Sequence, residues 1–70
     1  MSEIEYSVRV GTNGILARAK TLEEAKMLLK HFREERGFKE AAIWQEEISF
    51  RYSDGTPAYK AGTLKRVEKG

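Results

Sequence analysis

The sequence contains no cysteine, one proline, one histidine and one tryptophan. Because cysteine is absent, neither a disulfide bond nor a thiolate metal site can add stability, and cysteine usage leaves the redox compartment open. No apolar run approaches the roughly 20 residues that a membrane span needs, and the polar start MSEIEYS is unlike a signal peptide. We therefore expect a cytoplasmic protein that does not associate with membranes.

The residue patterns of common active sites are also missing. No pattern brings a nucleophile such as Ser49 to His31. Glu46 and Glu47 are consecutive, so on a strand their carboxylates point to opposite faces. One histidine and scattered carboxylates have no metal-ligand spacing, and the GTNG segment lacks the lysine of a P-loop. We expect a protein that is not an enzyme and that binds no metal or cofactor.

A chain of 70 residues forms one domain at most, and its core only narrowly outweighs the conformational entropy lost on folding. Self-association would therefore stabilise it. The net charge is +2, from 13 basic and 11 acidic side chains, which is too small to indicate nucleic-acid binding on its own. The positive excess lies near the C-terminus, where four basic residues are opposed only by Glu68.

Apolar residues alternate with polar ones over residues 4–10, which predicts a strand with one buried face. Asn13 and Gly14 follow as the centre of a type I′ turn, because both residue types accept positive φ. A second strand over residues 15–20 completes the predicted hairpin.

An amphipathic helix comes next. Thr21 and Glu24 have the spacing of a capping box at its start. Gly37 at its end can adopt the left-handed conformation, with Phe38 folding back onto Phe32 or the residue after it. The apolar face of this helix consists of Leu22, Ala25, Leu28, Leu29 and Phe32.

The stretch AAIWQEEISFRY, residues 41–52, alternates like a strand except at residues 45–47. One straight strand of this length would be about twice as long as its neighbours. We therefore expect a bend or β-bulge at the polar triplet. Asp54 and Gly55 then predict a second hairpin, and Pro57 predicts that its last strand lies at a sheet edge.

These elements predict an α+β fold of order β-β-α-β-β, an antiparallel sheet with one helix packed on one face. Residues 1–61 form the single domain. Residues 62–70 form a basic C-terminal tail that is loosely docked or disordered, because it offers few apolar contacts.

Aromatic residues form the first candidate site, because a sheet this small has little inner surface to cover them and aromatics are enriched at interfaces. The predicted second hairpin places Tyr59 opposite Phe50. Either these residues pack in the core, as apolar strand residues usually do, or the helix covers mainly the first hairpin and the second needs cover from a protein partner or a second copy. The candidate partner-binding residues are Trp44, Phe50, Tyr52 and Tyr59.

Basic residues form the second candidate site, for nucleic acid or another anion. The predicted register sets Arg9 opposite Arg18, and like charges opposite each other cost stability. Either the pair contacts phosphate, or Glu5 and Glu46 neutralise it. The candidate anion-binding residues are Arg9, Arg18, Lys20, Lys60, Lys65, Arg66 and Lys69.

The sequence therefore predicts a small, non-enzymatic and homodimeric protein-interaction module that binds through the second hairpin or an edge strand. The alternative is a nucleic-acid-binding domain that uses the basic face of the first hairpin and the basic tail. A third possibility is a small anionic ligand, held between subunits by the same arginines.

Overall fold

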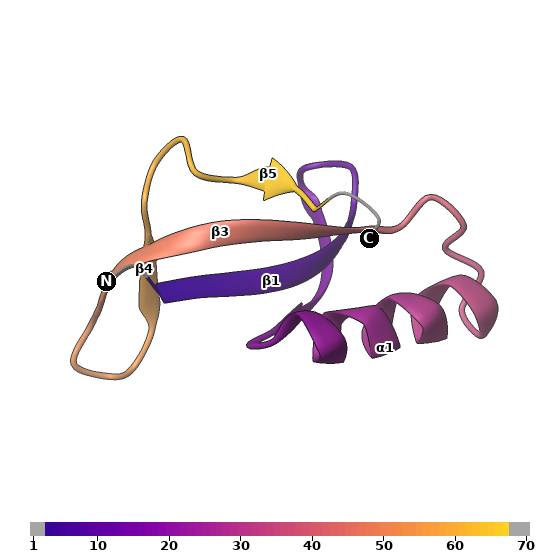
Figure 1. Cartoon of the computed structure of the whole chain (residues 1–70), viewed down its shortest axis with the longest axis horizontal. Helices are drawn as coiled ribbons and strands as arrows, with labels where there is room; N and C mark the ends of the chain where they lie inside the picture. The colour runs from indigo at the N-terminus through magenta and orange to yellow at the C-terminus, as the bar shows by residue number, and fades with distance from the viewer. Residues whose placement is uncertain (1–2, 68–70) are drawn as a thin grey trace.

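The computed structural model describes residues 3–67 and places one helix on one face of an antiparallel sheet (Figure 1). Its elements, in chain order, are β1 (Glu3–Val10), β2 (Gly14–Ala19), α1 (Leu22–Glu34), β3 (Ala42–Arg51), β4 (Pro57–Tyr59) and β5 (Lys65–Arg66). The strand order is β2-β1-β3-β4, and β5 also pairs with β3. The predicted α+β architecture is confirmed, as is the edge position of the strand that begins with Pro57; β5 is an addition to the predicted order.

The ends of α1 follow the local sequence. The Thr21 hydroxyl accepts a hydrogen bond from the Glu24 amide at 3.1 Å, and Glu24 Oε1 accepts one from the Lys20 amide at 3.1 Å. Gly37 has a φ of +78°, and the Phe38 amide donates to the Phe32 carbonyl oxygen at 2.9 Å. The predicted Thr21 cap and the predicted fold-back are therefore present. Glu24 accepts from the Lys20 amide instead of the Thr21 amide that a capping box would use, and the helix itself ends at Glu34.

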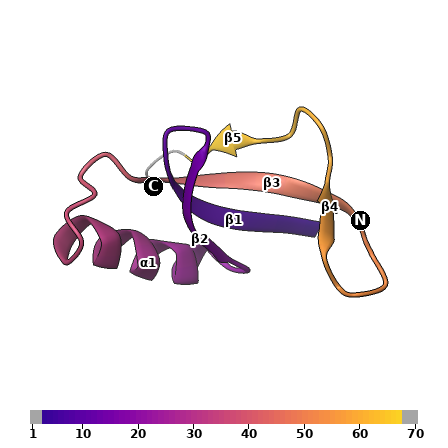
Figure 2. The ribbon, with the colours of Figure 1, turned by 180° about the vertical axis from the view of Figure 1, so that it is seen from behind.

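α1 packs on what is here called the helix-side face of the sheet. It lies against β1, β2 and β3 and does not reach β4, which lies toward the opposite end of the sheet (Figure 1 and Figure 2). Ala25 of the helix is fully buried against Ala19 and Ile43, whose small or compact side chains allow a close approach. The residues packed around this cluster are Tyr6, Leu22, Leu28, Leu29 and Val67.

The first hairpin differs from the predicted type I′ turn. Gly11, not Asn13 or Gly14, has the positive φ, at +70°. Gly14 is still required, because a Cβ there would lie 2.6 Å from the Val10 carbonyl oxygen. β2 also carries one extra residue, Leu16, at a bulge where the register with β1 shifts. The turn prediction was wrong because a longer loop, together with the bulge in β2, also connects the two strands and lets them pair.

β3 does not break at residues 45–47, so the predicted bend was wrong. Its register with β1 is regular over its first seven residues, and the ribbon is continuous (Figure 1). The polar triplet instead marks where the other edge of β3 changes partner, from β5 to β4. Between these partners, the Glu47 carbonyl oxygen accepts from the Lys60 amide at 2.9 Å, and the Glu47 amide donates to Thr63 Oγ1 at 3.0 Å.

The irregularity in β3 lies further along, between Ile48 and Phe50, in its pairing with β4. As a result Tyr59 lies opposite Ile48, and the predicted Tyr59–Phe50 pair is wrong. The C-terminal segment, for which docking and disorder were both open, pairs through β5 as far as it is described. The Val67 amide donates to the Ile43 carbonyl oxygen at 2.9 Å.

Candidate functional site

The sheet face opposite α1, here called the open face, carries charged residues from its central strand. Tyr6 packs toward the helix, so strand alternation places Glu5, Ser7 and Arg9 on the open face. Ser7 and Arg9 are only 2% and 5% exposed although no helix covers them. A buried charge is costly unless it is paired and hydrogen-bonded. The partners of Arg9 therefore decide whether its guanidinium is structural or free to bind a ligand.

Arg9 has three partners within the chain. Its Nε donates to Ser7 Oγ at 2.7 Å, and one terminal nitrogen donates to the Thr12 carbonyl oxygen at 2.8 Å. The other terminal nitrogen lies 3.4 Å from Glu46 Oε1. The planar guanidinium fork suits such a set of acceptors. Arg9 therefore connects β1, the first loop and β3, and its buried head group is not presented to solvent.

A second cluster, here called the Glu5 cluster, consists of Glu5, Arg18 and Tyr59. Arg18 Nη1 lies 3.3 Å from Glu5 Oε1, and the Tyr59 hydroxyl donates to the same oxygen. The Arg18 guanidinium carbon lies 4.7 Å from the centre of the Tyr59 ring, which is a cation–π distance. Burial, with the bond to Glu5 as a second cause, raises the pKa of Tyr59 from 10.0 to about 12.

The predicted opposition of Arg9 and Arg18 is wrong. Arg9 lies opposite Ile15, and Arg18 lies opposite Ser7, because of the longer loop and the bulge at Leu16. The neutralised alternative is confirmed: Arg9 pairs with Glu46 and Arg18 with Glu5. Glu5 neutralises Arg18, and its signal in the sequence was its place among the polar positions of an alternating strand.

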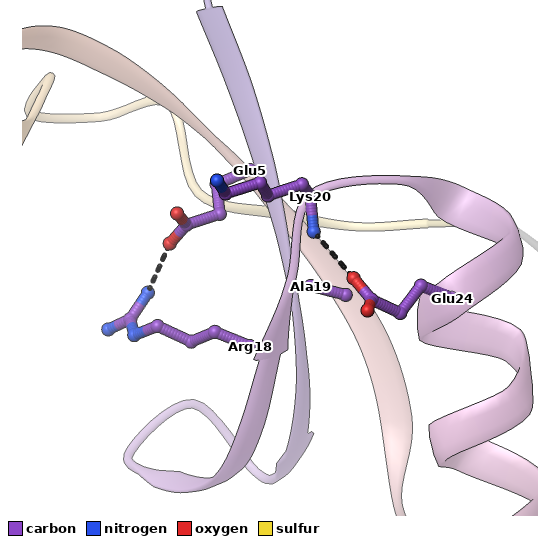
Figure 3. Close-up of a pocket in the computed structure, with 5 residues that line it drawn as sticks. All are labelled: Glu5, Arg18, Ala19, Lys20 and Glu24. Carbon is purple, nitrogen blue, oxygen red and sulfur yellow. Dashed lines mark hydrogen bonds and ion pairs between the residues drawn. The ribbon is translucent and has the colours of Figure 1, made fainter.

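The Glu5 cluster borders an open pocket of about 420 Å³ (Figure 3). Its lining residues are Glu5, Arg18, Ala19, Lys20 and Glu24. Figure 3 shows that Arg18 is turned toward Glu5 and that Glu24 is turned toward the backbone of Lys20. Two of the lining side chains are acidic and two are basic, so their formal charges cancel and do not favour an anion.

The four candidate aromatic residues do not form one surface. Trp44 and Tyr59 are half-buried, Trp44 opposite Arg66 and Tyr59 in the Glu5 cluster. Phe50 and Tyr52 are 54% and 56% exposed, and their rings meet edge to face at 5.1 Å. These two residues, here called the hairpin patch, lie at the hairpin between β3 and β4. Sequence spacing could not separate the two pairs, because their burial depends on distant strands.

Backbone and charged contacts order the hairpin that carries this patch. The Tyr52 amide donates to the Thr56 carbonyl oxygen at 2.8 Å, and Asp54 Oδ1 accepts from the Thr56 amide at 2.9 Å, which lowers the pKa of Asp54. Arg51 Nη2 lies 2.7 Å from Glu3 Oε2 and lowers the pKa of Glu3. The patch is therefore presented on an ordered turn.

The remaining candidate cations are scattered. Lys20 lines the pocket beside α1, Lys60 follows β4, and Lys65 and Arg66 form β5. All four are exposed. Consecutive strand residues point to opposite faces, so the two cations of β5 do not share one surface. Lys69 lies outside the described residues.

No protein-family model, curated protein or solved structure matches this chain.

Over residues 3–67, no group of three or more histidine, cysteine or acidic residues has an arrangement that could hold a metal ion. The helix in this part of the chain is too short and too polar to cross a membrane. His31 lies 3.6 Å from Glu35, one helical turn away on an exposed face.

Proposed function

We propose that the chain is a non-enzymatic protein-interaction module that binds a partner protein through the hairpin patch. The exposure of Phe50 and Tyr52 carries this proposal, because two large rings in edge-to-face contact leave about half of their surface in water. Aromatic side chains held in this way are typical anchors of protein interfaces. The partner would offer an apolar surface to the two rings.

The position of the patch supports the same interpretation. α1 does not reach β4, so this end of the molecule has no cover from its own helix.

The sheet edges are less suited to binding by strand addition. β2 carries a bulge at Leu16, and β4 is three residues long and begins with Pro57, which has no N–H to donate. The hairpin, rather than an edge strand, is therefore the favoured surface.

A capture experiment with matched variants tests the proposal. The wild type, the Phe50→Ser/Tyr52→Ser double variant and Met27→Ser are each used as bait in extract of the native host. Met27 is 74% exposed on the outer face of α1 and serves as the control. A captured protein is then purified, and its affinity for each variant is measured by calorimetry.

We expect the wild type and Met27→Ser to bind equally and the double variant to lose roughly 10-fold or more in affinity. Circular dichroism checks that the double variant is folded. If the folded double variant retains wild-type affinity for every captured protein, the hairpin patch is not the binding surface.

Nucleic-acid binding is the second candidate function. It is supported by the pairing of Arg66 with Trp44, which sets a cation beside a half-buried ring, and by the exposed Lys60 and Lys65. Titration with single-stranded and duplex oligonucleotides at low salt tests it, because such binding must weaken steeply as salt rises. No binding at low salt would remove this candidate.

A further inference from the structure

β4 has little to hold it in place. It is three residues long, it lies next to β3 alone, and α1 does not contact it. Pro57 lacks an N–H donor, and the register with β3 is irregular between Ile48 and Phe50. Short strands with few contacts open locally at low free-energy cost. The hairpin patch lies at the end of β3, beyond Ile48, where β3 pairs with β4 and no longer with β1, so the patch moves with β4 unless a further contact holds that strand.

Tyr59 supplies that contact across the open face. Its hydroxyl donates to Glu5 of β1, and its ring lies against the guanidinium of Arg18 in β2. Arg18 and Glu5 are themselves paired at 3.3 Å. One side chain of the edge strand β4 is thus tied to β1 and to β2, the strand at the opposite edge of the sheet. The Glu5 side chain is only 12% exposed, so solvent screens the cluster less than it screens a surface pair.

We propose that the Glu5 cluster positions the hairpin patch. Glu5, Arg18 and Tyr59 act as positioning residues: they hold β4 against the curled sheet and so set the direction in which Phe50 and Tyr52 point. The bond from the Tyr52 amide to Thr56 closes the turn between β3 and β4, and the Arg51–Glu3 ion pair joins β3 to β1, so neither ties β4 to β1 or β2. The consequence for partner binding rests on the proposed function, whereas the conformational role does not.

Amide hydrogen exchange measured by NMR tests the conformational role. Tyr59→Phe keeps the ring beside Arg18 and removes only the hydroxyl. Thr21→Ala is the control, because it removes a helix cap and so also weakens the fold, but far from β4. The reporting amides are those of Tyr52, which donates to Thr56 directly before β4, and Lys60, which follows β4 and donates to Glu47 of β3.

We expect these two amides to exchange about ten-fold faster in Tyr59→Phe than in Thr21→Ala, because only the first variant releases β4 locally. The Glu35 amide, which donates to His31 in α1, should not show this difference. Glu5→Gln should repeat the Tyr59→Phe result. If the Tyr52 and Lys60 amides exchange equally in the two variants, or if Glu35 accelerates with them, the proposal is overturned.

A binding measurement then separates this proposal from the proposed function. For a partner captured through the hairpin patch, Tyr59→Phe should lower the affinity several-fold, and saturating partner should slow exchange at Tyr52 again. If exchange responds as expected and no partner depends on Phe50 and Tyr52, the positioning role stands and the proposed function fails.

Discussion

The two faces of the sheet are built on different physical principles. The helix-side face packs alanine against alanine and isoleucine beneath α1, with leucines around them. The open face has no helix, and it buries Arg9 and Ser7 within hydrogen bonds to Thr12 and Glu46. Stabilisation on the first face depends on apolar area and close packing, whereas the second, which also buries Ala42 and Ile48, depends in addition on satisfied charges.

The two faces should also differ in which substitutions they tolerate. On the helix-side face a substitution is costly when it changes volume, because the helix and sheet cannot separate without losing contacts. On the open face a substitution is costly when it leaves a partner charge unpaired, whatever its size. The two faces should therefore respond to different mutations, and the three predictions below follow from that contrast.

The largest effect is expected from Arg9→Met on the open face. The variant keeps most of the side-chain volume but leaves Glu46 without its cation and Ser7 without its donor. We expect the free energy of unfolding to fall by about 3 kcal/mol, at the lower end for a buried pair because Glu46 is partly exposed. Urea unfolding of the wild type and of Arg9→Met measures this loss of stability.

The double variant Arg9→Met/Glu46→Leu is the matched control for this effect. Replacing both charges by apolar groups should recover the part of the loss that comes from the unpaired Glu46, while Ser7 and the Thr12 carbonyl still lack the Arg9 donor. A double variant as unstable as Arg9→Met alone would show that the lost hydrogen bonds to Ser7 and Thr12, not the unpaired charge of Glu46, account for the effect.

A smaller effect is expected from Ala25→Leu on the helix-side face. Ala25 is fully buried, so the larger side chain must push α1 away from Ala19 and Ile43. We expect a loss of about 1–3 kcal/mol in the free energy of unfolding, measured by urea unfolding. Met27→Leu, on the exposed side of the same helix, should change stability little. Equal effects at the two positions would mean that α1 is not packed as described.

The smallest effect is a pH dependence that belongs to the open face alone. The pKa of Tyr59 is about 12 in the folded chain against an ordinary 10.0, so the unfolded state releases this proton first as pH rises. The contribution is therefore fully present below pH 10 and is lost as pH rises through about 12.

Urea unfolding at a series of alkaline pH values measures this dependence. Tyr59→Phe should show a shallower loss of stability over this range than the wild type, and Tyr52→Phe, at an exposed position, serves as its control. Equal slopes for the wild type and Tyr59→Phe would contradict the raised pKa.

Local patterns predicted most of the fold. Thr21 and Gly37 mark the two ends of the helical region, and Pro57 marks the edge strand, because each acts through its own backbone or that of a near neighbour. Two predictions, the type I′ turn at Asn13-Gly14 and the bend at residues 45–47, were wrong for a common reason. Both were derived from one segment in isolation, whereas a bulge and a change of strand partner decide them.

The candidate site was predicted less completely. Phe50 and Tyr52 were candidate partner-binding residues together with Trp44 and Tyr59, but alternation along one strand could not show that the second pair is half-buried. The contact between Tyr59 and Glu5 joins residues 54 positions apart, so no local signal connects them.

Short-range interactions thus determine the order of helix and strands and the caps of α1, because each depends on the backbone preferences of a residue and its near neighbours. The register of the first hairpin, the partners of Arg9 and Arg18 and the division of the aromatic residues arose only when the strands were assembled. These features depend on which distant groups meet in a region poor in water, where an unpaired charge or donor is too costly to leave.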